Sequence, residues 1–172
     1  MNDESSAANT GGEKIRDLTS RYLALTLGGE PYAIPLAQVK EVIAMTNITS
    51  LPNSPAHFKG VLDLRGQVIP IIDLRSKLNL KDPRVGSDTP IVILDLAPLS
   101  LGIIVDSVDS VLAVRPEEIS DNPEIGTSIK TSYLNGIVKR DKKLVLILNI
   151  RATLDLEDLS ILKNQNTNKQ SA

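Results

Sequence analysis

The 172-residue sequence lacks cysteine and tryptophan, and it has one histidine, one phenylalanine and three tyrosines. Without cysteine there is no disulfide framework, thiol nucleophile or thiolate metal site. Zinc sites usually need three or four ligands, and a single histidine would leave a mostly carboxylate set that is unlike the usual zinc sites. We therefore expect no metal and no cofactor.

Long hydrophobic runs are also absent. No stretch approaches the roughly 18 apolar residues that span a bilayer, and the polar start MNDESSAANTGGEK has no apolar core of a signal peptide. We expect a cytoplasmic protein without direct membrane insertion. The net charge of -2 gives no electrostatic reason to bind nucleic acid, and so few aromatic rings offer little stacking for single strands.

The residues that could carry catalysis are sparse. His57, in the context PAHFKG, is expected to be a solvent-facing or packing histidine, and no serine lies in a G-x-S-x-G context. The acidic pairs Glu117-Glu118 and Glu157-Asp158 fall in polar stretches and are expected on a solvated surface. The sequence therefore predicts a protein that is not an enzyme.

The chain contains an internal duplication. Residues 22–43 align without a gap on residues 91–112 at an offset of 69, and residues 60–74 align on residues 136–150 at an offset of 76. The two offsets place a loop about seven residues longer in the second copy, within residues 113–135.

Each copy predicts a short strand, a tight turn, a second strand, a connector and a hairpin. Short strands separated by Gly, Pro and Asn favour small barrels, so we expect an all-β fold of two barrels over residues 20–82 and 88–152. The strands VIPIIDL and LVLILNI are apolar on both faces, which implies a second layer packed across a shared apolar core.

Helices and tails frame the barrels. Asp73 and Asn149 follow these two strands, and both are good N-cap residues. They predict a short helix after the first copy and a longer C-terminal helix over about residues 150–163. The polar ends, residues 1–18 and 164–172, are expected to be disordered.

The hairpin KGVLDLRGQVIPIIDL carries an arginine at its tip, Arg65-Gly66. On an extended strand Asp63 and Arg65 share one side and would form an exposed charge pair, which stabilises a fold by roughly 0–1 kcal/mol. The second copy has Asp141 where the first has Arg65. We therefore expect Arg65 to serve a partner and not the turn.

These segments resemble the CheW adaptor proteins of bacterial chemotaxis. KGVLDLRGQVIPIIDLR is similar to the hallmark hairpin of that family, YLALTLGGEPYAIPLAQVKEVI to its opening strands and LGIIVDSVDSVL to a later block. The resemblance covers about residues 20–160 and implies a single CheW-like domain, residues 19–163, built as two five-stranded, SH3- or OB-like barrels.

The resemblance also implies a function. It implies a non-enzymatic scaffold that couples the cytoplasmic tips of chemoreceptors to the histidine kinase CheA, whose regulatory domain is itself similar to CheW. Ring assembly with CheA or with other CheW copies would follow, and would bring the protein to membrane-associated receptor arrays through its partners. The receptor-binding residues implied by motif position are Arg65, Glu41, Val39, Val108 and Val111.

Three hairpin residues are implied to be structural: Gly60 at its base, Gly66 in its turn, and Asp63. The family usually carries Asn where this chain has Asp63. The added negative charge predicts either an internal pair with Arg65 or a different receptor partner.

Two other classes of function stay open at this point. Small barrels often bind nucleic acid, so a barrel-type oligonucleotide-binding protein is the alternative hypothesis, although charge and aromatic content argue against it. The third hypothesis is a hydrolase or metalloenzyme whose active site is built from the acidic residues.

Overall fold

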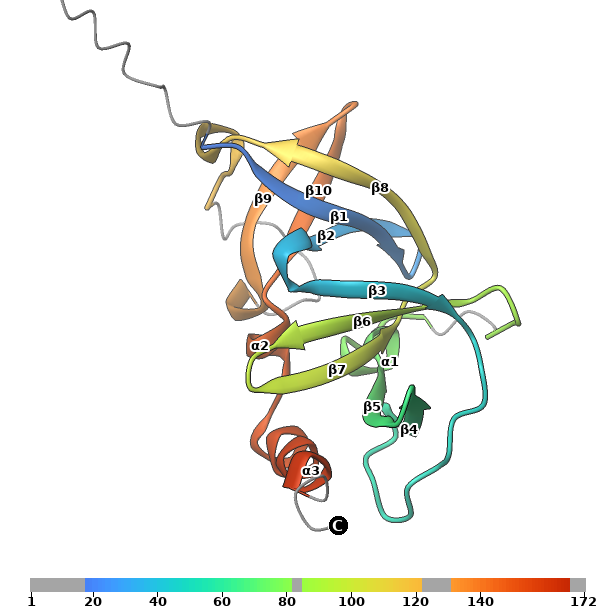
Figure 1. The fold of residues 1–172 in the computed structure, drawn as a ribbon. Helices are drawn as coiled ribbons and strands as arrows, with labels where there is room; N and C mark the ends of the chain where they lie inside the picture. Colours follow the sequence, from blue (N-terminus) through green and yellow to red (C-terminus); the bar gives the residue numbers. More distant parts are fainter. Residues whose placement is uncertain (1–17, 82–84, 122–130, 168–172) are drawn as a thin grey trace, which may run out of the picture.

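The computed structural model describes residues 18–81, 85–121 and 131–167, in which ten strands form two five-stranded sheets (Figure 1). The first sheet contains, in spatial order, β8 (Ser107–Val114), β1 (Ser20–Leu27), β2 (Glu30–Pro35), β10 (Lys143–Leu148) and β9 (Leu134–Arg140). The second contains β3 (Val39–Ala44), β6 (Pro90–Leu96), β7 (Leu99–Ile104), β5 (Gln67–Asp73) and β4 (Phe58–Leu64). The short helices are η1 (Leu36–Gln38), α1 (Leu74–Lys77), η2 (Pro116–Glu118), η3 (Thr131–Tyr133), α2 (Ile150–Thr153) and α3 (Leu156–Thr167). The all-β fold of two five-stranded units is confirmed.

Each sheet takes strands from both copies of the repeat. Hairpin β1–β2 comes from the first copy but joins β8, β9 and β10 of the second, while hairpin β6–β7 of the second copy joins β3, β4 and β5 of the first. The expected barrel boundaries, 20–82 and 88–152, are therefore wrong as structural units, although they do bound the repeat. Side-chain alternation along a strand is the same whichever copy supplies its neighbour, so the pattern cannot reveal this exchange.

The strand registers follow the duplication. Val39 lies opposite Leu94 in the β3–β6 pair. At the 69-residue offset Val39 corresponds to Val108 and Leu25 corresponds to Leu94, and Val108 lies opposite Leu25 in the β8–β1 pair. The two copies are thus arranged with an approximate two-fold relationship, which relates β3 to β8.

The apolar side chains form one large core and two small ones. The large core takes residues from both sheets, among them Leu25 and Leu94. Each small core contains side chains of one sheet only. Along β5, Ile71 belongs to a small core and Ile72 to the large one, and both are almost fully buried. This confirms the shared core and the strands buried on both faces.

The helices match the sequence in their caps but not in their extent. Asp73 accepts from the backbone N–H of Arg75 at 3.1 Å, and Asn149 accepts from that of Ala152 at 3.2 Å, so both predicted N-caps are confirmed. The single C-terminal helix expected over residues 150–163 is wrong, because two helices, α2 and α3, occupy this region.

The expected tails are tested only in part. Helix α3 extends to Thr167, so the disordered tail predicted for 164–172 is wrong over its first residues. The predicted leader falls almost wholly on residues 1–17, which lie outside the described part of the chain. No helix among the described residues is long and apolar enough to cross a membrane.

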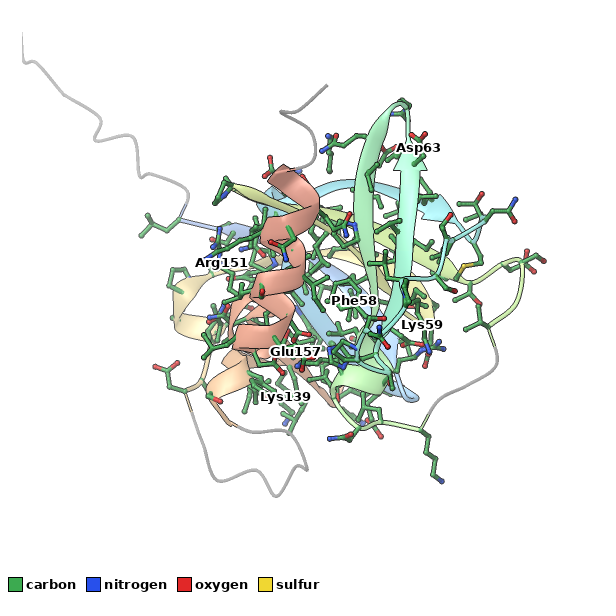
Figure 2. The ribbon with its side chains drawn as sticks, turned by 90° about the horizontal axis from the view of Figure 1, so that it is seen from below. Phe58, Lys59, Asp63, Lys139, Arg151 and Glu157 are labelled. Carbon is green, nitrogen blue, oxygen red and sulfur yellow. The ribbon has the colours of Figure 1, made fainter. Side chains whose placement is uncertain are left out.

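A charge cluster fixes α3 to the sheets. Asp158 is fully buried, with Oδ1 2.5 Å from His57 Nε2 and Oδ2 2.6 Å from Lys77 Nζ. The solvated surface expected for Glu157-Asp158 is wrong for Asp158, because its partners come from the segment before β4 and from α1. The lone histidine therefore packs against α3, which lies alongside the β4–β5 hairpin in the view from below (Figure 2).

We expect the attachment of α3 to weaken in acid through Asp155. This carboxylate accepts from the backbone N–H of Asp158 at 2.9 Å and from Lys77 Nζ at 2.9 Å, and these two contacts lower the pKa of Asp155 from 3.8 to about 2. Burial lowers the pKa of Lys77, but the carboxylates of Asp158 and Asp155 together raise it above its ordinary value.

Because the folded-state pKa of Asp155 is depressed, its contribution to stability is present above about pH 4 and is lost as the pH falls to about 2. Urea unfolding at pH 5, 4, 3 and 2 should show wild type losing its advantage over Asp155→Asn across this interval. A difference between the two proteins that stays constant with pH would contradict the assignment.

In each sheet, the segment that follows one edge strand pairs with the strand at the other edge, through a single β-bridge. Thr49, after β3, exchanges two backbone hydrogen bonds with Val61 of β4 at 2.9 and 2.8 Å. Ser120, after β8, forms the same bridge with Ile137 of β9, with both bonds at 2.9 Å. At the first bridge a Cβ on Gly60 would lie 2.0 Å from the Thr49 carbonyl oxygen, so the close backbone approach explains the glycine at the hairpin base.

A buried ion-pair cluster joins α1 to the segment between β7 and β8. The Arg75 side chain is 1% exposed and pairs with Asp73, itself fully buried, and with Asp106. Hydrogen bonds from Arg75 to Asp73 and Asp106 raise the pKa of the guanidinium, outweighing the effect of burial. The arginine therefore stays charged within the protein interior.

Candidate functional site

The tip of the β4–β5 hairpin is a two-residue turn with Arg65 and Gly66 in the left-handed region, at φ 52° and 81°. Turns with positive φ at both central residues match the twist of the two strands. The Gly66 N–H donates to Asp63 Oδ1 at 2.9 Å, so Asp63 fixes the turn (Figure 2 labels it near the tip). An asparagine would offer the same acceptor, which accounts for either residue at this position.

Arg65 pairs with Glu41 of β3 and not with Asp63, so the internal pair expected with Asp63 is wrong. Its Nη1 and Nη2 donate to Glu41 Oε1 and Oε2 at 3.2 and 3.0 Å. The arginine side chain is 75% exposed and that of Glu41 is 23% exposed. A bidentate pair fixes the orientation of a guanidinium, and an oriented, exposed arginine is a common anchor at protein interfaces.

Turn geometry does not account for the arginine. The corresponding turn of the β9–β10 hairpin places Asp141 and Lys142 in the left-handed region at φ 48° and 63°. The second copy thus builds the same turn with neither arginine nor glycine. Arg65 is therefore available for a role outside the fold.

The predicted valines lie on two related strands. Val39 begins β3, which also carries Glu41, whereas Val108 and Val111 lie on β8 in the other sheet. Val39 and Val108 are partly buried against the shared core, and Val111 is 51% exposed. Both strands lie on the side of the molecule that faces the viewer in Figure 1.

One exposed apolar residue was missed by sequence reasoning. Val42 on β3 is 43% exposed and lies opposite Val92 of β6. The 69-residue offset pairs it with Val111, which lies opposite Leu23 of β1. The repeat alignment was the signal that could have identified Val42 once Val111 had been chosen.

The described residues offer little for chemistry. No three His, Asp or Glu side chains of residues 18–81, 85–121 and 131–167 gather as a metal site. Nε2 of His57 is committed to the buried Asp158 carboxylate. The arrangement on β3, β8 and the hairpin tip presents apolar side chains and fixed charges, which suits binding.

Comparisons with known proteins agree on one family. The model of the CheW-like domain matches residues 21–158. The chemotaxis protein CheW of Klebsiella aerogenes is 32% identical over 143 residues, covering 83% of this chain and 86% of that protein. That of Bacillus subtilis is 33% identical over 137 residues, covering 80% and 88%. The crystal structure of the scaffolding protein TtCheW from Thermoanaerobacter tengcongensis matches with a TM-score of 0.74 at 28% identity, covering 81% of this chain and 90% of that one.

Proposed function

Because this chain belongs to the CheW family of chemotaxis adaptors, we propose that it couples the cytoplasmic tips of chemoreceptors to the histidine kinase CheA. The receptor would dock on β3, β8 and the β4–β5 tip, using the predicted residues Arg65, Glu41, Val39, Val108 and Val111. The kinase would bind through its regulatory domain, which resembles this fold. Ring assembly with CheA or further copies of this chain would hold the adaptor at receptor arrays.

The observation that carries this proposal is the Arg65–Glu41 pair. It places a fixed, exposed cation above a strand whose neighbouring side chains include partly exposed valines. An apolar surface with a charged rim is suited to an amphipathic helix. No catalytic step is assigned, since the family is one of scaffolds and the single histidine serves in packing. The oligonucleotide-binding alternative is not favoured, because the matching family and relatives are chemotaxis proteins.

We expect Arg65→Glu to weaken receptor binding by about tenfold or more while leaving the fold intact. The new carboxylate would face Glu41 and replace a neutral ion pair with two negative charges. Loss of an interface arginine commonly costs tenfold or more, about 1.4 kcal/mol per decade. The melting temperature should change little because an exposed pair contributes roughly 0–1 kcal/mol. Isothermal titration with a receptor-tip fragment and thermal unfolding measure the two quantities.

The matched control is Lys142→Glu, which reverses a charge in the equivalent turn of the β9–β10 hairpin. It should leave binding close to wild type. Wild type that binds neither a receptor-tip fragment nor the CheA regulatory domain would refute the proposed function. A large fall in melting temperature for Arg65→Glu would instead show that the arginine is structural.

A further inference from the structure

The tip of the β9–β10 hairpin concentrates positive charge. Residues 139–143 read KRDKK, with four cations and one anion, whereas the whole chain carries a net charge of -2. At the 76-residue offset, residues 63–67 of the first copy read DLRGQ and carry no net charge. Both copies build a two-residue turn with two positive φ angles. The turn therefore does not require the additional cations of the second copy.

Three of these cations are exposed and unpaired. The side chains of Lys139, Lys142 and Lys143 are exposed, and none of them forms an ion pair with a carboxylate of the described residues. Asp141 is the only acidic residue within the tip and is exposed as well. The tip thus presents three ammonium groups and one carboxylate to the solvent.

The remaining cation, Arg140, anchors the tip to the rest of the sheet. Its Nη1 donates to Glu118 Oε1 at 2.9 Å, and its Nη2 donates to the Ala113 carbonyl oxygen of β8. Hydrogen bonds from the Arg115 N–H and from Arg140 lower the pKa of Glu118, so this carboxylate stays charged and keeps its pair. The exposed lysines are therefore carried by a hairpin whose end is fixed against β8.

Lys142 occupies a backbone conformation that lysine disfavours. Its φ is 63°, and the first copy has Gly66 at this position with φ 81°. Asp141, at φ 48°, is a common turn residue because aspartate tolerates the left-handed region. Lysine has no such advantage, and glycine would relieve the strain. Strain that persists at an exposed position points to a role for the side chain outside the fold.

An apolar side chain lies beside the lysines. Leu144 is 49% exposed and pairs with Lys139 across the two strands. Two residues further along the same face of β10, Leu146 is already part of the shared core. Residues 139–144 contain no aromatic ring that could stack on a base. The surface is thus a small apolar contact edged by cations.

We propose that the β9–β10 tip is a docking site for a short acidic segment of a partner protein. Its carboxylates would lie against Lys139, Lys142 and Lys143, and an apolar side chain of the segment would contact Leu144. A short segment meets only the local positive charge. A nucleic acid or a lipid surface would extend over the remainder of the chain, whose net charge is negative, and would be repelled there.

This site is separate from the proposed receptor surface. The β9–β10 hairpin ends at the top of the molecule in Figure 1, while the β4–β5 hairpin lies in its lower half. Lys139 and Asp63, which lie near the two tips, are labelled at opposite ends of Figure 2. The inference therefore does not depend on receptor coupling, and variants of the basic tip should bind a receptor-tip fragment as wild type does.

The test is a titration of the nitrogen-15-labelled full chain, followed by its amide signals. The probe is an acetylated pentapeptide of four glutamates around a leucine, and the control peptide has glutamines in place of the glutamates. At about 0.02 M salt we expect the acidic peptide to shift the signals of residues 139–144, and at about 0.5 M salt this shift should disappear. Equal shifts around Lys40 and Lys81, no shift at the tip, or an equal effect of the control peptide would overturn the proposal.

The same titration decides between classes of partner. Pentathymidylate carries four negative charges, as the acidic peptide does, and should shift the tip signals less. Vesicles of phosphatidylcholine with phosphatidylserine should not sediment the protein. A stronger response to the oligonucleotide, or sedimentation with the vesicles, would overturn the assignment to an acidic protein segment.

Charge removal should weaken peptide binding at the tip only. Lys139→Gln with Lys143→Gln is expected to lower the affinity for the acidic peptide by about threefold to tenfold, since each exposed charge contributes modestly. The matched control, Lys59→Gln with Lys81→Gln, removes the same charge elsewhere and should bind as wild type does. Equal losses in the two double variants would show that the peptide senses net charge and not this site.

Lys142→Gly separates binding from folding. We expect it to lower the affinity for the acidic peptide by about threefold and to raise the melting temperature by about 2 °C, because glycine adopts this turn without strain. A lower melting temperature would show that the lysine serves the fold, and unchanged affinity would show that it does not serve binding. Because wild type is titrated first, a variant that fails to fold would not prevent a decision.

Discussion

Gly60→Ala is expected to lower the free energy of unfolding by about 4 kcal/mol, a large share of the 5–15 kcal/mol typical of a domain. Two effects add. Gly60 has φ 137°, where L-residues are strained by roughly 1–3 kcal/mol, and its new Cβ would lie 2.0 Å from the Thr49 carbonyl oxygen. Moving Thr49 away would break its two hydrogen bonds with Val61, worth about 1 kcal/mol each.

The repeat supplies the matched control. Gly136 occupies the equivalent position in β9, where φ is 157°, so a side chain is strained there too, and a Cβ would lie 2.3 Å from Cγ2 of Ile119 and 3.4 Å from the Ser120 carbonyl oxygen. Both substitutions strain the backbone, but at Gly136 the nearest obstacle is a side-chain methyl group and not a backbone carbonyl oxygen, so no backbone hydrogen bond has to break. Gly136→Ala should therefore cost about 1–2 kcal/mol less than Gly60→Ala. Urea unfolding of both variants measures the difference. Equal losses would show that the Thr49 bridge is not the source of the effect.

Arg75→Leu is expected to destabilise the protein by about 3–5 kcal/mol, because it leaves the fully buried Asp73 carboxylate without its partner. The guanidinium now donates to both Asp73 oxygens at 2.9 Å and to Asp106 at 3.0 Å. Equilibrium unfolding in urea measures the loss. The double variant Asp73→Asn with Arg75→Leu should recover part of it, since asparagine keeps the helix cap but carries no charge.

Arg151 provides the control for Arg75. It follows the Asn149 cap as Arg75 follows Asp73, but it is exposed and its Nη2 donates to the Ala97 carbonyl oxygen. Arg151→Leu should therefore cost less than about 1 kcal/mol. If the two arginine variants were equally stable, the buried ion pair would not be a major source of stability.

Much of the fold follows from local patterns. Turn residues, apolar alternation and the repeat predicted the hairpins and the shared core, and the short polar side chains of Asp73 and Asn149 predicted two helix caps. The exchange of hairpins between copies could not be predicted, since it depends on which strands pair and not on what any strand contains.

The candidate site shows the same limit. The repeat singled out Arg65 because Asp141 replaces it, and the family resemblance named Glu41 as its companion. Two charges on the same side of one strand suggested an Asp63–Arg65 pair, but the Asp63 carboxylate instead accepts a hydrogen bond from the Gly66 N–H in the hairpin turn. The burial of Asp158 was likewise hidden, because its partner His57 lies far away in the sequence.

The exchanged hairpins place β3 and β8, the strands proposed to bind the receptor, next to the two points where the chain passes between the sheets. The chain crosses from one sheet to the other twice, through η1 before β3 and through Val105 and Asp106 before β8. Asp106 forms an ion pair with Arg75, so the second connection between the sheets is fixed to α1. A helix bound across β3 and β8 would therefore contact the chain beside both connections between the sheets. Such a ligand would set the angle between the two sheets.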